Sequence, residues 1–326
     1  MKNSPEINQI LKIMEEKNRF LITSHKDPDG DSIGSQLGLF LALKNAGKEV
    51  IIVNQGGMPE RYNFLDPDKL VNFTIRELPF SPEAVFVLEC PSIDRIGFVQ
   101  DLIPKTAPIV NIDHHLHNDG YGSINWVDTK SCAVGELIYF LLEQGEFKIT
   151  PAIAEKLYAA LMSDTGNFRF SSTTARGIKV AGELVDKGAE PKKIFDNIFA
   201  KASPSTLLLL GYTLSTLQVT GNGAISYMAV TRANVARAQG RIEDSEGFVD
   251  YSLAVSGVRM GILFKEIDKN EIKVSVRTQN GVDAAKFASR FDGGGHANAA
   301  GFTINKTFDD TIRLVIDGAR EYLNAS

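Results

Sequence analysis

Four of the five histidines in this 326-residue chain lie in three short segments that also carry acids or glycines. The segments are His25-Lys26-Asp27-Pro28-Asp29-Gly30-Asp31, Asp113-His114-His115 and Gly293-Gly294-Gly295-His296. Imidazole nitrogens combined with several carboxylates are the ligands that a pair of divalent transition-metal ions requires, and such a pair makes a nucleophile from water. The segments therefore indicate metal-assisted hydrolysis.

The first segment places one imidazole and two carboxylates in a tight turn. His25, Asp29 and Asp31 follow an apolar run and precede a helical pattern, at the edge where open α/β sheets present reactive groups. We expect Gly30 to relieve crowding between the two acids. The alternative is helix capping, which is common in Asp-rich turns. Of the acids here, we assign Asp27 to capping.

The second segment follows another apolar run, residues 109–112. One imidazole can bind metal while its neighbour faces a substrate oxygen as a proton donor, and Asp113 can orient a ring through the ring's other nitrogen. Histidine pairs also occur in surface turns. His117 lies outside any recognisable ligand spacing, and we expect it to be an exposed loop residue.

Two further acids occupy the ends of apolar elements. Asp164 ends a helical pattern, where the helix dipole disfavours a carboxylate. A bound cation would compensate, although solvation in a loop is also adequate. Glu89 follows the apolar run 84–88 and is a candidate to bridge two cations; the alternative is a strand-end acid paired with Arg95.

The third segment lies in the second half of the chain. Backbone amides of a glycine run can approach an anionic group while His296 donates to it, and Arg277 offers a planar fork to a phosphate. The alternatives are a flexible turn between elements for residues 293–296 and a surface salt bridge for Arg277.

The elements that must position these residues form an α/β pattern in the first half of the chain. Short apolar strands are expected at residues 20–23, 49–54, 84–88 and 108–112, with helices at 32–46, 133–142, 151–162 and 174–187. A break at residues 201–205 precedes a smaller α+β unit, with strands at 223–230, 253–264 and 271–277 and a helix at 282–289. We expect two domains.

Composition limits the function classes. A net charge of −5 and a pI near 5.7 argue against a broad basic face for long duplex nucleic acid. The two cysteines are in no CxxC arrangement, and no segment reads as a secretion signal or a membrane span. We expect a cytoplasmic protein that has no membrane as a partner.

Taken together, five stretches of the chain resemble the DHH phosphoesterase superfamily, in the subfamily of bifunctional oligoribonucleases and phosphoadenosine-phosphate phosphatases. The stretches are SHKDPDGDSIGS, VLECPSIDRIG, NIDHH, LMSDTGNFRFSSTTAR and VSVRTQNGVDAAKFASRFDGGGHANAAGF. The resemblance implies a parallel-sheet DHH catalytic domain with helices on both faces over residues 1–190, a connecting helix or linker over 191–212, and an α+β DHH-associated substrate-binding domain over 213–326. It also implies an active site in the cleft between the domains.

The resemblance assigns roles to individual residues. It implies two divalent ions, usually manganese, bound by His25, Asp29, Asp31, Glu89, His114 and Asp164. His25 and Asp29 would belong mainly to one ion, Asp31, His114 and Asp164 mainly to the other, and Glu89 to both. His115, together with Asp113, would serve the catalytic step, and Arg277, Gly293, Gly294, Gly295 and His296 would bind substrate.

This sequence departs from the family pattern at two positions. Glu89 stands where the family normally has aspartate, and Asp292 stands where it often has another glycine. The longer Glu89 side chain changes how closely two ions can be bridged. Asp292 places an acid beside the expected phosphate site.

The implied activity is hydrolysis of a phosphodiester or phosphomonoester on a short nucleotide such as nanoRNA, pApA or pAp. A pyrophosphatase or polyphosphatase would use a similar metal cluster but lacks the C-terminal signature. A nucleotide-binding regulatory protein with a degenerate site is the alternative from another class, and it is motivated by Glu89. A homodimer is compatible with the resemblance.

Overall fold

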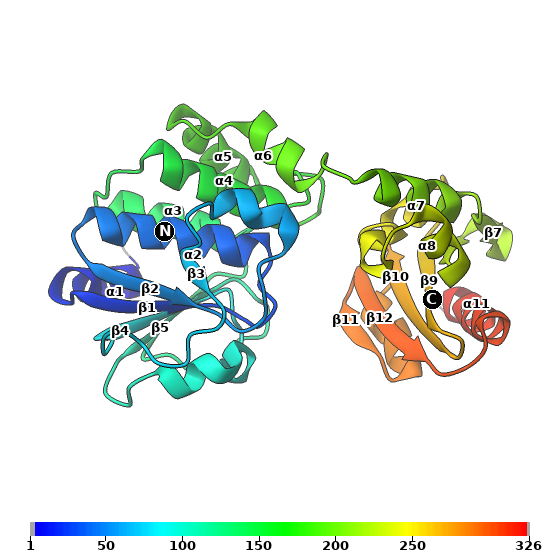
Figure 1. The fold of residues 1–326 in the computed structure, drawn as a ribbon, viewed down its shortest axis with the longest axis horizontal. Coiled ribbons are helices and arrows are strands. Elements are labelled where there is room, and N and C mark those ends of the chain that lie inside the picture. Colours follow the sequence, from blue (N-terminus) through cyan, green and yellow to red (C-terminus); the bar gives the residue numbers. More distant parts are fainter. Residues whose placement is uncertain (1–3, 325–326) are drawn as a thin grey trace. The chain divides into compact units, whose positions relative to one another are not determined.

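The computed structural model describes residues 4–324 and divides between Lys201 and Ala202 into two compact units, each with its own six-stranded sheet (Figure 1). Each unit has a separate hydrophobic core.

The sheet of the first unit is entirely parallel, in the order β3-β2-β1-β4-β5-β6. Its strands are β1 Arg19–Thr23, β2 Glu49–Val53, β3 Val71–Asn72, β4 Ala84–Leu88, β5 Ile109–Asp113 and β6 Ile124–Val127. Strand order reverses direction between β1 and β4, and open α/β sheets bind ligands outside the carboxyl ends of the strands at such a point.

Both faces of this sheet are buried. Its helices are α1 Pro5–Glu16, α2 Gly30–Asn45, α3 Val134–Gln144, α4 Pro151–Asp164, α5 Ala175–Asp186 and α6 Pro191–Ile198. They share one core with one side of β1, represented by Phe20 and Ile22. The opposite side, represented by Leu21, packs against the 3-10 helix η2 Ile93–Leu102. The predicted α/β architecture is therefore confirmed, with a 3-10 helix as the cover of the second face.

Helix α2 approaches α4 closely because small residues line their contact. A Cβ atom on Gly34 would lie 2.4 Å from the carbonyl oxygen of Lys156. A Cβ on Gly30 would lie 2.3 Å from Oγ of Ser163. Helix packing is therefore a requirement for Gly30 that was not predicted from the sequence, and its role in relieving crowding between the two acids stays a prediction. This contact holds the start of α2 beside the end of α4.

The second unit contains a mixed sheet in the order β11-β12-β10-β9-β8-β7, in which only the β8–β9 pair is parallel. Its strands are β7 Gln218–Thr220, β8 Ile225–Val230, β9 Met260–Asp268, β10 Glu271–Thr278, β11 Gly294–His296 and β12 Ala299–Ile304. Its helices are α7 Pro204–Leu214, α8 Arg232–Ala238, α9 Val249–Leu253, α10 Ala284–Ala288 and α11 Phe308–Asn324.

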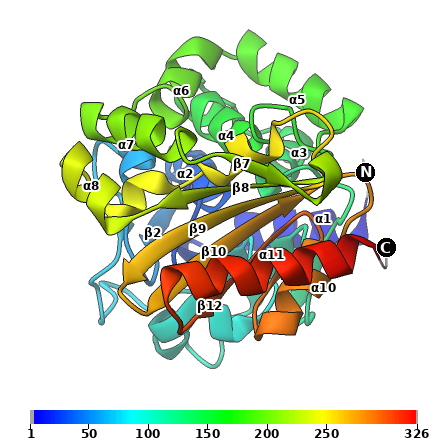
Figure 2. The ribbon, with the colours of Figure 1, turned by 90° about the vertical axis from the view of Figure 1, so that its right-hand side faces the viewer.

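Helices cover the two faces of this second sheet unequally. Helices α10 and α11 pack on the face that carries Ile272, Val274 and Val276 (Figure 2). On the other face, α7 and α8 pack over β8 and over Leu263 of β9.

One predicted strand in this unit is wrong. Residues 253–264 contain the end of α9, a bend and the start of β9 rather than one strand. Gly257 has a φ of 83°, a left-handed conformation that breaks a continuous element. A continuous apolar run does not distinguish a helix end from a strand. Residues 294–296, for which a flexible turn was the alternative to a substrate-binding loop, form strand β11.

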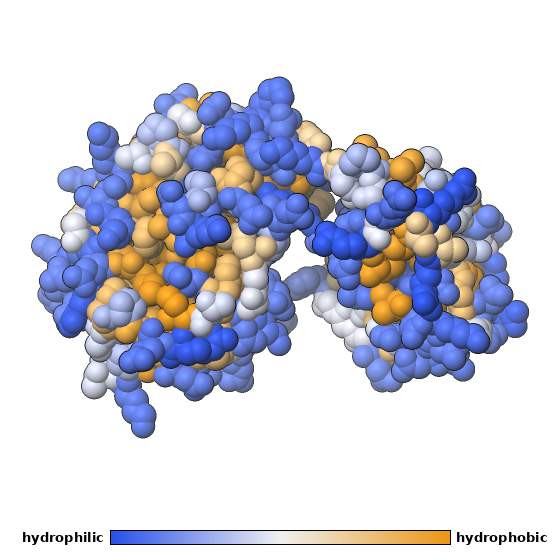
Figure 3. Space-filling model, in the orientation of Figure 1, coloured by the Kyte–Doolittle hydropathy of each residue, from blue (hydrophilic) through white to orange (hydrophobic). Residues whose placement is uncertain are grey.

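Between residues 4 and 324, no helix combines the length and the apolar character that crossing a membrane requires. Figure 3 shows hydrophilic side chains over much of the displayed face, with apolar residues between them.

Candidate metal centre

The chemistry-bearing residues of the first unit follow neighbouring parallel strands. His25 lies two residues after β1, Glu89 directly follows β4, and Asp113 is the last residue of β5. Because β1 pairs with β4 and β4 with β5, their carboxyl ends meet at one edge of the sheet. Asp164 reaches the same place as the last residue of α4.

The acidic turn before α2 has a different capping residue from the predicted one. Asp29 is the N-cap, and its carboxylate accepts a 3.0 Å hydrogen bond from the amide of Ser32. Asp27 instead has a φ of 57° and donates its amide to the carbonyl of Gln55. The assignment of Asp27 to capping is therefore wrong, and Asp29 both caps α2 and offers a carboxylate to the cluster.

Glu89 occupies the middle of the cluster. Its Oε2 lies 2.6 Å from Nε2 of His25 and accepts a 2.7 Å hydrogen bond from Oγ of Ser32. Its Oε1 lies 3.5 Å from Nε2 of His115 and 3.9 Å from Nε2 of His114. The side chain of Glu89 is 5% exposed, so these groups are its environment in place of water.

The donor atoms fall into overlapping groups in which all atoms lie within 4.8 Å of one another. One group contains His25, Asp29 and Glu89, and another contains Asp31, His114 and Asp164. A third joins Glu89 to His114 and His115. The structure thus brings together all six residues that the resemblance implies as ligands, with Glu89 beside both sets. That they bind metal stays a prediction.

The cluster carries an excess of negative charge. Burial, together with repulsion from Asp29 and Asp31, raises the pKa of Glu89 well above its usual range. Burial and then Asp31 raise the pKa of Asp164 to about 7. Burial opposes protonation of His114, but the carboxylates of Asp31 and Asp164 raise its pKa to about 9. A cation bound in the cluster would therefore have to displace protons that these raised pKa values favour.

These residues fit divalent metal ions by their chemistry. Neutral imidazole nitrogens and carboxylate oxygens are ligands for transition metals, and ligand atoms must converge from several directions. Here they converge from β1, β4, β5, α2 and α4. Hydrogen bonds to the second ring nitrogen also orient two of the imidazoles. Nδ1 of His25 lies 2.8 Å from the carbonyl oxygen of Lys26, and Nδ1 of His114 lies 3.2 Å from the carbonyl oxygen of Ser131.

His115 is held by a different partner. Its Nδ1 lies 2.7 Å from Oδ1 of Asp113, whose other oxygen accepts a 2.6 Å hydrogen bond from Asn118. Asp113 is buried, which acts to raise its pKa, but the contacts with His115 and Asn118 lower it overall. An ionised Asp113 therefore orients His115 with Nε2 toward Glu89. His117 is exposed, as predicted.

A buried network behind the cluster was missed at the sequence level. Glu136, which is fully buried, accepts hydrogen bonds from Oγ of Ser131, from the amide of Cys132 and from Nε of Arg176. Arg176 also donates to Asp128 over 3.0 Å. This network holds the loop before α3.

The same loop contacts two of the candidate ligands. The amides of Val134 and Gly135 donate to the carboxylate of Asp31 over 2.6 and 2.9 Å. The carbonyl of Ser131 faces His114 at 3.2 Å. Ser32 was also missed, although its place directly after an acidic turn was a signal. Arg176 lies forty residues from Glu136, and no sequence spacing joins them.

The candidate substrate-binding residues of the second unit share one region of its sheet. Arg277 of β10 and His296 of β11 both pair in register with Ala299 of β12. Nε of Arg277 lies 3.3 Å from Oδ1 of Asp250, so the guanidinium has an acidic partner. A Cβ on Gly295 would lie 2.4 Å from the carbonyl oxygen of Ala299, so this glycine is required by close strand approach.

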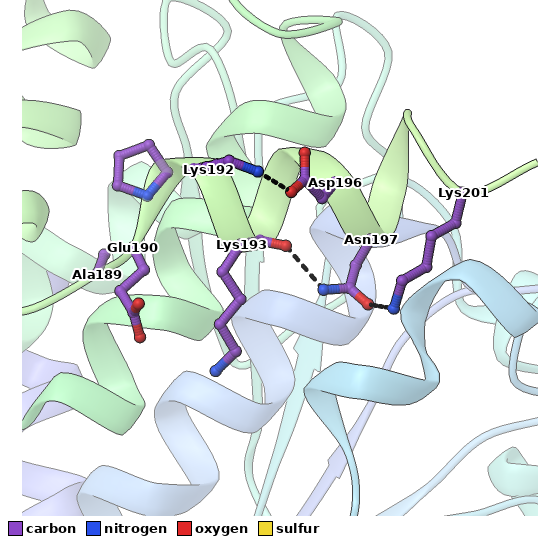
Figure 4. Close-up of a pocket in the computed structure, with 8 residues that line it drawn as sticks. Ala189, Glu190, Lys192, Lys193, Asp196, Asn197 and Lys201 are labelled. Atoms are coloured by element: carbon purple, nitrogen blue, oxygen red, sulfur yellow. Dashed lines mark hydrogen bonds and ion pairs between the residues drawn. The ribbon is translucent and has the colours of Figure 1, made fainter.

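A surface hollow of about 640 Å³ lies elsewhere in the first unit, along residues 189–201 (Figure 4). Lys192 pairs with Asp196 there, and Asn197 bonds both to Lys201 and to the carbonyl of Lys193. Its basic side chains are largely occupied by these local partners. The convergent chemistry lies in the histidine–carboxylate cluster.

Comparisons with known proteins agree with this geometry. The DHH family, N-terminal domain, matches residues 19–162, and the DHHA1 domain matches residues 228–325. The bifunctional oligoribonuclease and PAP phosphatase NrnA of Thermus thermophilus is 32% identical over 97% of this chain and 93% of its own length. The protein of the same name from Bacillus subtilis is 28% identical over 95% of this chain and 96% of its own length.

Solved structures share the fold. An exopolyphosphatase-related protein from Bacteroides fragilis superimposes with a TM-score of 0.89 at 27% identity, covering 97% of this chain and 95% of that protein. RecJ from Thermus thermophilus, solved in complex with Mn²⁺, has a TM-score of 0.53 at 12% identity, covering 99% of this chain and 55% of that protein.

Proposed function

This chain belongs to the DHH family, and we propose that it is a metal-dependent phosphoric ester hydrolase that cleaves short oligoribonucleotides or dinucleotides and the 3′-phosphate of pAp. Its near full-length relatives are named for both oligoribonuclease and PAP phosphatase activity. The observation that carries the proposal is the convergence of three histidines and four carboxylates at the carboxyl edge of the parallel sheet.

Two divalent ions, most readily Mn²⁺, are the proposed cofactors. His25 and Asp29 would hold one ion, Asp31, His114 and Asp164 the other, and Glu89 both, because the donor atoms of each set lie within 4.8 Å of one another. When bound, such ions activate water and neutralise charge on the phosphoryl oxygens. The fully buried Asp31 is anchored by two amides of α3, so its carboxylate is held in place before metal arrives.

His115 and Asp113 are the proposed catalytic pair outside the ligand set. Asp113 accepts the proton on Nδ1 of His115 over 2.7 Å and thereby directs Nε2 toward the cluster. In the imidazolium form, Nε2 carries a proton that can pass to the leaving oxygen of the substrate. Asn118 keeps Asp113 from rotating by holding its second oxygen.

Residues 213–326, which form most of the second unit, are the proposed substrate-binding domain, with residues 1–190 as the catalytic domain and 191–212 as the connection. Arg277 supplies a guanidinium suited to phosphate. His296 lies level with it across the sheet, because both residues pair in register with Ala299. Of the proposed substrate-binding glycines Gly293, Gly294 and Gly295, Gly294 leaves its backbone uncovered, because a Cβ there would meet no atom within 4 Å.

The test is incubation of the purified chain with and without Mn²⁺ against pAp, pApA, a five-nucleotide RNA and pyrophosphate, with products separated by chromatography. We expect Mn²⁺-dependent release of mononucleotide from the RNA substrates and of phosphate from pAp. Asp31→Asn should lower turnover by at least about 100-fold because it removes one charge from a ligand set.

The matched control is Asp186→Asn, which changes an acid in the last turn of α5, outside the cluster. Retained turnover in this control would show that the loss in Asp31→Asn is specific. Turnover of pyrophosphate alone would instead identify a pyrophosphatase. Binding of pApA without turnover of any substrate would identify a regulatory nucleotide-binding protein and contradict the proposal.

A further inference from the structure

One part of the second sheet has an open polar face. Along β10, the alternating residues Ile272, Val274 and Val276 point into the core, so Lys273, Ser275 and Arg277 lie on the opposite face. Helices α10 and α11 pack on the core side. On the polar side, α9 contacts β9 and β10 where Asp250 meets Arg277, whereas Lys273 of β10 and Gly294 of β11 are exposed.

Two lysines lie directly opposite each other on this face. Lys273 of β10 pairs in register with Lys265 of β9, and both point away from the core. Like charges directly opposite on antiparallel strands are destabilising. Within residues 4–324 neither lysine makes a hydrogen bond or an ion pair, whereas Arg277 on the same face contacts Asp250.

The surroundings do not supply an alternative structural role for this pair. Burial, and then the charges of Lys273 and Arg277, lower the pKa of Lys265, although Glu246 and Glu243 lie near enough to act in the opposite direction. The acids near this face therefore lie beside Lys265 and Arg277, while Lys273 makes no ion pair within residues 4–324. Strands β9 and β10 carry three cations and three acids, and all three cations share one face.

The floor between the cations is made of small side chains. Ser275 lies between Lys273 and Arg277 on β10, and it pairs in register with Gly301 of β12, which pairs with Gly294 of β11. A Cβ on Gly294 would meet no atom within 4 Å. Arg277 lies four residue steps along the strand from Lys273, about 13 Å at the usual rise. That span exceeds one phosphate group and suits an anion with charges at both ends.

We propose that Lys265 and Lys273 form a phosphate subsite for single-stranded oligoribonucleotides, one that holds a second backbone phosphate while Arg277 and His296 hold another. This inference rests on the proposed function and narrows its substrate class, because pAp is too short to gain from the lysine pair. The chain then favours oligonucleotides of more than two residues.

The experiment compares the full-length double variant Lys265→Gln/Lys273→Thr with the parent chain. Threonine suits a strand, and removal of the cross-strand repulsion should retain or raise the melting temperature. We expect the KM for a five-nucleotide RNA to rise about 10-fold, with the KM for pAp changed less than about 2-fold. In fluorescence anisotropy with labelled pentaadenylate, the slope of log affinity against log salt should fall by about 0.7 for each lysine removed.

The control is Lys286→Gln, an exposed lysine of α10 on the other side of the sheet. It should leave the KM for both substrates and the salt slope unchanged. Parental KM and salt slope in the double variant would overturn the inference, as would an equal rise in KM for pAp and for the pentanucleotide. If the parent hydrolysed nothing, the proposed function would fail, and the anisotropy measurement would still decide the subsite.

Discussion

At the scale of single residues, the candidate metal centre is defined by competition between protons and cations. Glu89 and Asp31 are both buried with raised pKa values, and Asp31 is stabilised as an anion only in part by two backbone amides. Burial of several acids without a cation is costly, so protonation is the alternative to metal binding. Metal binding and protonation of these residues should therefore be mutually exclusive.

Metal affinity should for this reason depend on pH. His114, with a pKa near 9, and Asp164, with a pKa near 7, both carry a proton below pH 7, and metal must displace both. Between pH 7 and 9 the proton of His114 still has to be displaced, and the raised pKa values of Glu89 and Asp31 add to this competition. We therefore expect log affinity for Mn²⁺ to rise by at least about one per pH unit above pH 7 and more steeply below it.

Calorimetric titration of the parent chain at pH 6, 7 and 8 measures this dependence. Asp164→Asn removes one titrating group, so its affinity should be lower at every pH and the rise in its log affinity per pH unit below pH 7 should be smaller than in the parent chain. An affinity of the parent chain independent of pH would contradict the assignment of these groups as ligands.

The two departures from the family pattern share a backbone feature. Glu89 has a φ of 53° and Asp292 a φ of 58°, both in the left-handed region. Glycine, and next asparagine and aspartate, occupy this region most readily. The backbone therefore explains why aspartate and glycine suit these positions, and Glu89 is the less favourable of the two exceptions.

At the scale of elements, the loop before α3 links two candidate ligands to one buried acid. Glu136 holds Ser131 and Cys132, and the neighbouring backbone contacts His114 and Asp31. Groups that orient metal ligands commonly change metal affinity by about 10–100-fold when replaced. Glu136→Gln should therefore weaken Mn²⁺ binding by about that factor, although Glu136 touches neither ligand side chain.

Glu143→Gln is the matched control, because Glu143 lies on the same helix, is exposed and pairs with Lys187. Calorimetric Mn²⁺ titration of both variants, with circular dichroism to verify folding, separates a positioning role from loss of structure. Glu136→Asp should restore part of the affinity. Folded Glu136→Gln with parental affinity would show that the loop needs no such support.

Local sequence predicted the elements whose signals are contiguous. The apolar run 84–88 coincides with β4, and Gly47 follows the end of α2 with a φ of 80°. Helix α1 was missed, although Ser4 caps it and Ile7, Ile10 and Met14 mark its buried face. Strand β11 was also missed, because glycine carries almost no strand preference and acquires it here from pairing with β12.

The same distinction applies to the site. His25, Glu89 and His114 could be anticipated because residues at the carboxyl ends of adjacent parallel strands meet, whatever lies between them in sequence. The contact between Glu136 and Arg176 could not be anticipated, because an ion pair between two helices leaves no periodic pattern in the sequence.

At the scale of the whole molecule, the two units contain different chemistry. The groups of histidines and acids suited to a metal, among residues 4–324, lie between His25 and Asp164 and so within the first unit. The second unit contains the candidate phosphate-binding residues Arg277 and His296. Each unit also buries its own apolar cluster, which is the requirement for folding independently.

Mn²⁺ should therefore stabilise one unit selectively. A ligand that binds only the folded state adds about 2.7 kcal/mol of stability at 100 times its Kd. Scanning calorimetry of the full chain and of the separate fragments 1–201 and 202–326 measures the effect. We expect Mn²⁺ to raise the melting temperature of fragment 1–201 by several degrees and to leave fragment 202–326 unchanged, because only the former holds the ligand set. A Mn²⁺-induced shift in fragment 202–326, or none in folded fragment 1–201, would contradict the placement of the metal centre.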